Sequence, residues 1–348
     1  MRALTVHPKL LQSARLDELA DVPGESTGLP LSPVCVGICG TDAEILRGDY
    51  GWAPPGHERL VIGHECVARV AESADGFKRG ELVVPIVRHP DPLPCAACAA
   101  GEWDMCRNGQ YTEHGIKELD GFCAERIRVS PDFLVRVPPS LGAHAVLVEP
   151  ASVVAKAWQH IERIGRRAYW APKRVLVTGA GPVGLLAALL GRQRGLDVTV
   201  FDRATEGPKP RLVRALGAEY RTGKLDSLLS DSLPDIVIEC TGASSVIVDV
   251  VGNNASAAIT CLVGISGSEL SIPIDVGALN RSIVLENDVI FGTVNANRRH
   301  FELAAQALAQ ADPAWLDSLI TRRVPLDRWQ DAFARRDDDV KVLLQVAE

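Results

Sequence analysis

Apolar residues follow two different spacings along this chain. In the first third, short apolar runs alternate with turn sequences such as Leu29-Pro30 and Asp75-Gly76, which is typical of antiparallel β-strands. The predicted strands cover residues 2–6, 34–38, 65–71, 82–87 and 122–129. From residue 153, apolar positions recur every three or four residues, as on one face of a helix. The pattern predicts a β-rich domain that is followed, near residue 150, by an α/β domain.

An apolar strand pattern at residues 175–178 runs into Gly-x-Gly-x-x-Gly and then into an apolar helical pattern. In that order the glycines predict a dinucleotide site. The first glycine permits a tight turn, the second lets the backbone approach a pyrophosphate, and the third allows close packing of helix on strand. The pyrophosphate would lie at the helix N-terminus, where free N–H groups and the helix dipole favour negative charge. The expected cofactor-binding residues of the motif are Gly179, Gly181, Pro182, Val183 and Gly184. A glycine turn in an ordinary βα unit is the alternative.

The next predicted strand, residues 198–201, ends at Asp202, which lies 18 residues after Gly184. An acidic residue at this point pairs with the 2′-hydroxyl of the adenosine ribose and would repel a 2′-phosphate, which favours NAD. Arg203 would serve a 2′-phosphate if Asp202 turned away, so use of NADP is also possible. An Asp–Arg pair on the surface, without a role in binding, is the alternative interpretation.

Two further apolar strand patterns, at residues 235–239 and 257–266, continue the α/β region and predict a doubly wound parallel sheet. In such a sheet, ligands bind at the carboxyl ends of the strands. We therefore expect Thr241, Val263 and Phe291 to line the nicotinamide. After residue 291 the chain would return to the first domain.

Composition narrows the range of functions. A chain of 348 residues with 47% hydrophobic and 23% charged residues is ordinary for a globular protein of about two domains. The net charge of −7 leaves no basic footprint for nucleic acid, and no apolar run approaches the roughly 18 residues of a membrane span. We expect neither nucleic acid nor membrane as a partner. Nine cysteines without a signal-peptide pattern predict free thiols or metal ligands in a reducing, cytoplasmic setting.

Candidate metal ligands occur within the β-rich region. Cys39 is followed by Gly-Thr-Asp, and His64 and Glu65 follow Gly63. Thiolate, imidazole and carboxylate are the ligand types that bind Zn²⁺, and a catalytic zinc takes three of them with one open position. Each motif alone also has a structural interpretation, with Cys39 as a small buried residue and Gly63-His64-Glu65 as a turn.

Together these motifs resemble the zinc-dependent medium-chain dehydrogenase/reductase superfamily, and the resemblance covers nearly the whole chain. Finer features resemble its glucose dehydrogenase branch, best known from archaea: residues 106–117, Leu-Asp-Gly-Phe at 119–122, Phe-Leu-Val-Arg-Val-Pro at 133–138 and Phe-Gly-Thr-Val-Asn at 291–295. The resemblance implies a β-rich, GroES-like catalytic zinc-binding domain made of residues 1–150 and 291–348. Residues 151–290 would form a Rossmann domain that binds the dinucleotide.

The resemblance also assigns roles to single residues. Cys39, His64 and Glu149 match the ligands of the catalytic zinc, and Glu65 matches a carboxylate that enters or leaves the coordination sphere. Thr41 matches the hydroxyl that relays the substrate proton. Zinc would hold the substrate oxygen and lower its pKa, and a hydride would pass to the nicotinamide.

The resemblance also implies residues of a substrate pocket. Glu113 and Asn295 match partners of sugar hydroxyls, beside Thr41 and Glu149. A solvated loop carboxylate is the alternative for Glu113. Val153 stands where the glucose enzymes often carry an aspartate, and the loop at residues 51–58 is suited to the rim of a cleft.

A second cysteine group matches three of the four cysteines of the superfamily's structural zinc lobe. These are Cys95, Cys98 and Cys106, and Pro92 stands at the first position. Since closed zinc sites take four ligands, His89 or Asp91 would have to substitute, or the lobe is held without metal.

The sequence therefore predicts a zinc-dependent NAD(P) oxidoreductase that oxidises a sugar hydroxyl, with glucose at C1 as the leading substrate and a lactone as product. The alternatives are a dehydrogenase for another polyol, amino sugar or secondary alcohol, a zinc-independent enone or quinone reductase, and a non-catalytic nucleotide-binding protein on the same fold. Because superfamily members associate through their cofactor domains, the resemblance also implies a homodimer or homotetramer.

Overall fold

The computed structural model describes residues 1–20, 22, 24–25, 27–231, 233–267 and 271–346. The chain divides into two compact units. Residues 1–152 and 295–348 make up the first, and residues 153–294 make up the second.

In its described residues the first unit contains three β-sheets, one of which lies in a small lobe. In the smaller of the other two, β1 (Arg2–Val6) lies between β2 (Arg15–Glu18) and β4 (Leu60–Val61). The larger has the order β11-β6-β5-β3-β19-β18, with β10 also paired to β3. Its strands are β3 (Leu29–Gly37), β5 (Glu65–Val70), β6 (Leu82–Pro85), β10 (Ile127–Val129), β11 (Leu134–Arg136), β18 (Ile320–Pro325) and β19 (Lys341–Gln345). The last two strands come from the end of the chain, so the C-terminal segment completes the sheet that carries the N-terminal motifs.

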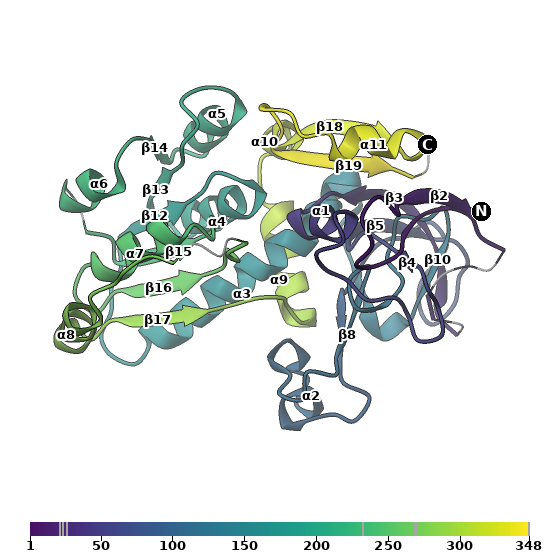
Figure 1. Ribbon diagram of the computed structural model, residues 1–348, viewed down its shortest axis with the longest axis horizontal. Helices are drawn as coiled ribbons and strands as arrows, with labels where there is room; N and C mark the ends of the chain where they lie inside the picture. The colour runs from purple at the N-terminus through teal and green to yellow at the C-terminus, as the bar shows by residue number, and fades with distance from the viewer. Residues whose placement is uncertain (21, 23, 26, 232, 268–270, 347–348) are drawn as a thin grey trace. The chain divides into compact units, whose positions relative to one another are not determined.

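A lobe projects from the strands of this unit, as Figure 1 shows around α2 and β8. It contains the short strands β7 (Arg88–His89), β8 (Thr112–His114) and β9 (Glu118–Leu119), with α2 (Ala96–Ala99) and the 3-10 helix η1 (Trp103–Met105) between β7 and β8. The other helical segments of the unit are α1 (Gly40–Leu46), η2 (Pro131–Phe133), η3 (Pro139–Leu147), α9 (Arg298–Ala309), α10 (Pro313–Leu319), η4 (Leu326–Arg328) and α11 (Trp329–Phe333).

The second unit contains a six-stranded sheet whose paired strands all run parallel, in the order β14-β13-β12-β15-β16-β17. The strands are β12 (Arg174–Thr178), β13 (Asp197–Phe201), β14 (Glu219–Arg221), β15 (Ile236–Glu239), β16 (Ile259–Leu262) and β17 (Val289–Gly292). Its helices are α4 (Pro182–Gln193), α5 (Pro208–Ala215), α6 (Leu225–Asp231), α7 (Ser244–Gly252) and α8 (Val276–Glu286), together with residues 153–165 of α3 (Val148–Gly165). Helix α4 packs on β12 and β13, and α7 packs on β15 and β16. The strand order reverses between β12 and β15, the position at which such sheets bind dinucleotides.

The α/β fold class predicted from the sequence, a β-rich domain with a doubly wound parallel sheet, is confirmed. Residues 2–6 form β1 as predicted, but only residues 127–129 of the expected strand at 122–129 pair as β10. Helix α3 (Val148–Gly165) begins earlier than the apolar pattern indicated. Pro150 does not prevent this because it lies in the first turn, where its missing N–H costs no helical hydrogen bond.

Among the described residues, no helix combines the length and apolar composition that a membrane span needs.

Candidate active site

Cys39, His64 and Glu65 come together because β3 and β5 are neighbours in the sheet. Cys39 caps helix α1 just after the end of β3, and His64 and Glu65 stand at the start of β5. The strands pair antiparallel with Gly37 opposite Glu65, which brings the two ends to the same place. One ligand atom from each of the three residues lies within 4.8 Å of the others. The structure thus assembles the thiol, imidazole and carboxylate that the sequence offered for a metal.

Asp42 holds two members of this group in place, and sequence reasoning gave it no role. It is fully buried. Its Oδ2 accepts a hydrogen bond of 2.9 Å from the backbone N–H of Cys39, and its Oδ1 lies 3.3 Å from His64 Nδ1. A carboxylate on Nδ1 leaves Nε2 of the imidazole for a metal. The three-residue spacing between Cys39 and Asp42, that of a capping box, is the signal that would have found it.

The contacts with Asp42 and Cys39 also change the pKa of His64. Burial opposes a charged imidazole, but the charge and hydrogen bond of Asp42, together with Cys39, hold the pKa of His64 well above its usual value. A metal ion bound to this ring would take the place of the proton.

Lys341 is a second residue that the sequence did not indicate. It comes from β19 and is buried, with its side chain only 2% exposed, and its Nζ forms an ion pair with Glu65 Oε2. The same Nζ donates a 3.0 Å hydrogen bond to the carbonyl of Ile38. Burial opposes the charge, but Glu65, Cys39 and Glu149 raise the pKa of Lys341 above its ordinary value. No local pattern identifies this lysine, since only the sheet brings residue 341 beside residue 65.

Glu149 lies in the first turn of α3, outside the group formed by Cys39, His64 and Glu65. Its carboxyl group is near enough to interact electrostatically with His64 and Glu65. Burial raises the pKa of Glu149 to about 7, with Glu65 adding to the rise and His64 opposing it. A cation bound at the group would lower that pKa. The ligand role of Glu149 stays a prediction.

Thr41 lies two residues after Cys39, within α1, and is partly buried. Its role as a proton relay stays a prediction.

The residues of this site fit a zinc ion. Four acidic or thiol side chains, Cys39, Asp42, Glu65 and Glu149, interact electrostatically around His64 and Lys341. Three carboxyl groups and a thiol in a largely buried place favour a further cation, because charged carboxylates there are costly without one. The sulfur, nitrogen and oxygen donors are also the set that zinc accepts at catalytic sites.

Glu113 and Asn295, the predicted partners of sugar hydroxyls, do meet. Asn295 Nδ2 donates a 2.5 Å hydrogen bond to Glu113 Oε1. The same oxygen accepts 3.0 Å contacts from Nε and Nη2 of Arg88, which is buried and stacks its guanidinium 3.6 Å from the ring centre of Tyr111. Arg88 was not among the predicted residues. It pairs with Glu113 because β7 and β8 are antiparallel neighbours with these two residues opposite each other.

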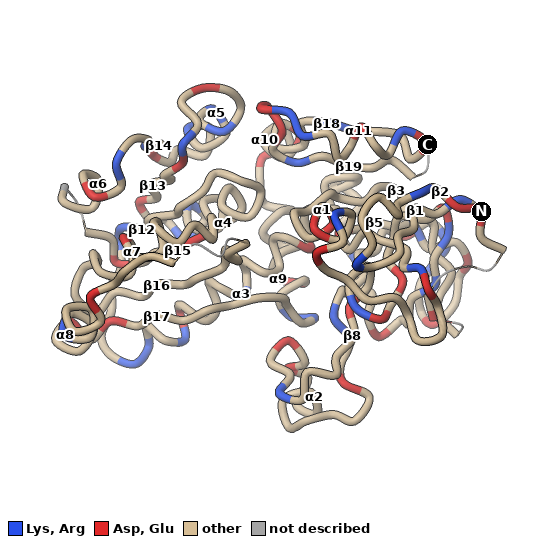
Figure 2. Tube along the Cα trace, viewed as in Figure 1, with Lys and Arg blue, Asp and Glu red and all other residues tan. Residues whose placement is uncertain are grey.

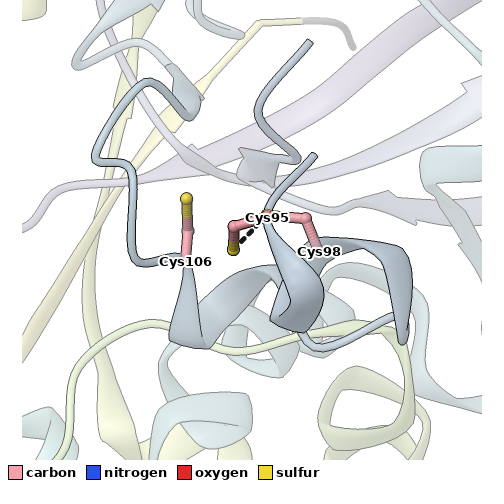
Figure 3. A group of neighbouring side chains, drawn as sticks. All are labelled: Cys95, Cys98 and Cys106. Atoms are coloured by element: carbon pink, nitrogen blue, oxygen red, sulfur yellow. Dashed lines mark hydrogen bonds between the residues drawn. The ribbon is translucent and has the colours of Figure 1, made fainter. Parts of the chain in front are cut away.

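The cysteine group of the lobe is also assembled. Cys95 caps α2, Cys98 lies within it, and Cys106 follows η1 (Figure 3). The three sulfurs lie within 4.8 Å of one another, and those of Cys95 and Cys98 are 3.7 Å apart. A hydrogen bond from the backbone N–H of Arg107 lowers the pKa of Cys95 to about 6, whereas burial raises that of Cys98 to about 11.

Neither predicted substitute for the fourth cysteine joins this group of sulfurs. His89 faces Glu25 at 3.4 Å and stacks on Phe133, and Asp91 Oδ1 accepts the backbone N–H of Leu93 at 2.8 Å.

The glycine motif has the geometry that a dinucleotide site requires. Gly179 has a φ of +91°, which residues with side chains rarely adopt. A Cβ on Gly184 would collide with the carbonyl oxygen of Gly179, so helix and strand are in the expected close contact. A Cβ on Gly181, at the start of α4, would meet no atom within 4 Å. Open space at that point fits a pyrophosphate against the helix N-terminus.

The predicted residues around the nicotinamide lie along one edge of the same sheet. Thr241 follows β15, Val263 follows β16, and Phe291 lies in β17, which are neighbouring strands (Figure 1). Thr241 is held by Glu239, which is buried and accepts hydrogen bonds from the N–H of Thr241 at 2.6 Å and from its hydroxyl.

Comparison with known proteins agrees with both halves of this description. Residues 31–139 match the family described as alcohol dehydrogenase GroES-like domain, and residues 142–346 match the family described as glucose dehydrogenase C-terminus.

Full-length relatives are also found. The chain is 41% identical to glucose 1-dehydrogenase of Thermoproteus tenax, covering 99% of each chain, and 39% identical to glucose 1-dehydrogenase 2 of Vulcanisaeta moutnovskia, covering 100% of each. Among solved structures, the glucose dehydrogenase of Haloferax mediterranei in complex with NADP, Zn and gluconolactone is similar over 100% of both chains. Its TM-score is 0.92 and its identity 28%.

Proposed function

This chain belongs to the glucose dehydrogenase family of zinc-dependent medium-chain dehydrogenases, and we propose that it oxidises C1 of an aldose, with glucose as the leading substrate, to the lactone. The carbon loses a hydride to NAD(P)⁺ and its hydroxyl loses a proton, so that one NAD(P)H and one H⁺ form per lactone. The observation that carries the proposal is the group of partly buried Cys39 and buried His64 and Glu65, arranged for a metal on the same chain as a dinucleotide site.

Each residue near the metal has a definite task in this proposal. Cys39, His64 and Glu149 would hold a zinc ion, and Glu65, which pairs with Lys341, would supply an exchangeable further carboxylate ligand. A zinc ion held there supplies a Lewis acid that polarises the substrate oxygen. Asp42 keeps the imidazole of His64 oriented through Nδ1. The hydroxyl of Thr41 relays the proton of the substrate hydroxyl, giving up its own proton toward solvent as it takes that of the substrate.

We assign sugar recognition to Glu113 and Asn295. Arg88 and Asn295 already orient the Glu113 carboxylate through its Oε1, so its other oxygen is the acceptor available to a sugar hydroxyl. A polyhydroxylated substrate needs such fixed partners because a hydroxyl buried without a hydrogen bond is costly.

For the nucleotide, residues 153–294 form the binding domain, with the glycine motif on the pyrophosphate and Asp202 and Arg203 near the ribose. The catalytic zinc-binding domain corresponds to the unit of residues 1–152 and 295–348, because β17 keeps residues 291 and 292 in the sheet of the nucleotide-binding domain. Thr241, Val263 and Phe291 line the nicotinamide. The Haloferax mediterranei glucose dehydrogenase was solved with NADP, which supports NADP as a cofactor beside the NAD that Asp202 favours.

The decisive experiment follows nicotinamide reduction over a panel of aldoses, polyols and secondary alcohols, with NAD and with NADP. Chelator-sensitive oxidation of glucose, lost in Cys39→Ala together with one bound zinc, is the expected result. Activity confined to a polyol or a secondary alcohol would replace the substrate assignment and keep the chemistry. Unchanged turnover in Cys39→Ala would remove zinc from the reaction.

We also propose that Cys95, Cys98 and Cys106 hold a structural zinc with three thiolates. The closeness of the three sulfurs supports this, and the thiolate character of Cys95 near neutral pH adds to it. Metal analysis should find two zinc ions per chain in the purified protein and one in Cys95→Ser. One zinc in both proteins would mean that the lobe is held without metal.

Finally, we propose that the chain forms a homodimer or homotetramer. Helix α8 exposes Val276, Val284 and Leu285, each by more than 60%, and β17 is the last strand at its side of the sheet. Exposed apolar surface of this kind is commonly covered by another chain. Sedimentation velocity tests the state, and Val284→Asp with Leu285→Asp should shift it toward the monomer.

A further inference from the structure

Asp202, the residue expected to bind the ribose, is already engaged by the chain itself. Its Oδ2 accepts a 2.7 Å hydrogen bond from the backbone N–H of Ala180, inside the glycine motif, and its Oδ1 accepts one of 3.0 Å from Ala204. Lys209 Nζ lies 3.3 Å from Oδ1 and 3.2 Å from Oδ2. Both carboxylate oxygens therefore have partners before any nucleotide binds.

Lys209 changes the charge that a nucleotide would meet. It lies in the first turn of α5, whose basic residues Figure 2 draws in blue. The side chains of Lys209 and Asp202 are only 24% and 12% exposed, so solvent screens their ion pair incompletely. Asp202 alone presents a negative charge to a 2′-phosphate, whereas the pair is neutral.

The lysine also keeps hydrogen-bonding capacity. An ammonium group has three N–H donors, and the two oxygens of Asp202 occupy at most two of them by direct contact. Arg203, next to Asp202, is exposed and adds a second cation at the end of β13. The loop that carries these groups is fixed by Tyr220, whose hydroxyl donates a 2.6 Å hydrogen bond to the carbonyl of Ala204.

We propose that Lys209 is a specificity-determining residue that allows the ribose end of the site to accept the 2′-phosphate of NADP as well as the 2′-hydroxyl of NAD. This inference rests on the proposed function, because it concerns the nucleotide of that reaction. Lys209 strengthens the binding of the 2′-phosphate in two ways. It offsets the charge of Asp202 that would repel the phosphate, and it donates a charge-assisted hydrogen bond to a phosphate oxygen. The binding of NAD depends on Lys209 much less, because its 2′-hydroxyl carries no charge.

The test measures binding directly, so it does not depend on turnover. Wild-type protein and Lys209→Met are titrated with NADPH and with NADH, and the change in nicotinamide fluorescence gives each Kd. Lys173→Met is the matched control: it removes the same charge from an exposed residue just before β12, at the opposite ends of the parallel strands from Asp202. Lys209→Arg keeps the charge, and thermal unfolding checks that every variant is folded.

We expect the wild type to bind both nucleotides. In Lys209→Met the affinity for NADPH relative to that for NADH should fall by at least about tenfold. This is the change that follows from losing one hydrogen bond to a charged group. Lys173→Met should leave the ratio unchanged, and Lys209→Arg should restore most of it. In Asp202→Asn the ratio should move further toward NADPH, because the repelling charge is gone while Lys209 remains.

Two results would overturn the inference: wild-type protein that binds NADH and not NADPH, or a Lys209→Met variant whose NADPH-to-NADH affinity ratio is unchanged, whether or not it weakens both nucleotides. Failure of the proposed function is distinguishable from these. Wild-type protein that binds neither nucleotide contradicts the dinucleotide site itself. Binding of both without glucose oxidation contradicts only the substrate.

Discussion

Removing the amino group of Lys341 should expose how much the site depends on its one buried lysine. Lys341 and Glu65 have side chains that are 2% and 3% exposed, so replacement by methionine leaves a buried carboxylate without its cation. Breaking a buried pair by removing one partner costs about 3–5 kcal/mol of unfolding free energy, far more than the pair itself contributes. We expect Lys341→Met to lose stability in that range in zinc-free protein.

The zinc-loaded protein should respond differently. In Lys341→Met a bound metal ion is the remaining cation next to Glu65, so zinc should stabilise this variant more than it stabilises the wild type. Urea unfolding followed by circular dichroism, with and without a chelator, measures both effects.

A double-mutant cycle with Glu65→Gln provides the control. Each single substitution leaves one charge unpaired, whereas the double variant leaves none. The double loss should therefore be smaller than the sum of the single losses by about 1–3 kcal/mol. Additive losses in zinc-free protein would refute the reasoning, because they would mean that the two groups do not depend on each other.

Three further predictions test other parts of the structure. Burial and the nearby His89 lower the pKa of His114 to about 3 from 6.5, so below pH 6.5 the unfolded chain binds a proton that the folded chain does not. Stability should fall by at most about 1.4 kcal/mol per pH unit from this group between pH 6.5 and 3, and chemical denaturation should show a shallower pH slope in His114→Gln. Gly184→Ala should lower the free energy of unfolding by about 1–3 kcal/mol in the same assay, because its Cβ would collide with the chain. Gly181→Ala should weaken nucleotide binding at nearly unchanged stability. Equal stability losses in the two variants would contradict this assignment. Arg88→Met should raise the KM for glucose about tenfold with a smaller change in kcat, since it releases the carboxylate assigned to the sugar; a fall in kcat at constant KM would count against sugar recognition there.

The features predicted correctly from the sequence are those that depend on interactions between neighbouring residues. The glycine motif needs only a strand, a tight turn and a helix within a short stretch, so its geometry can be anticipated from neighbouring residues. Cys39 and His64 were identified by residue type, and β3 and β5 then brought them together. The limits of elements were less predictable. Helix α3 can begin at Val148 because Pro150 lies in its first turn, where its missing N–H costs no helical hydrogen bond.

The sequence by itself determined the two kinds of fold and the residue types for zinc and dinucleotide, because periodicity and short motifs depend on contacts between near neighbours. Only the tertiary structure decided which charges surround them. Lys341 reaches Glu65 across 276 positions through the pairing of β19 with β3, and Asn295 reaches Glu113 across 182 positions. Even Lys209, seven residues from Asp202, becomes its partner only because the fold places the start of α5 beside the end of β13. Such pairs leave no periodic trace in the sequence, since distance along the chain carries no information about which surfaces a sheet will bring into contact.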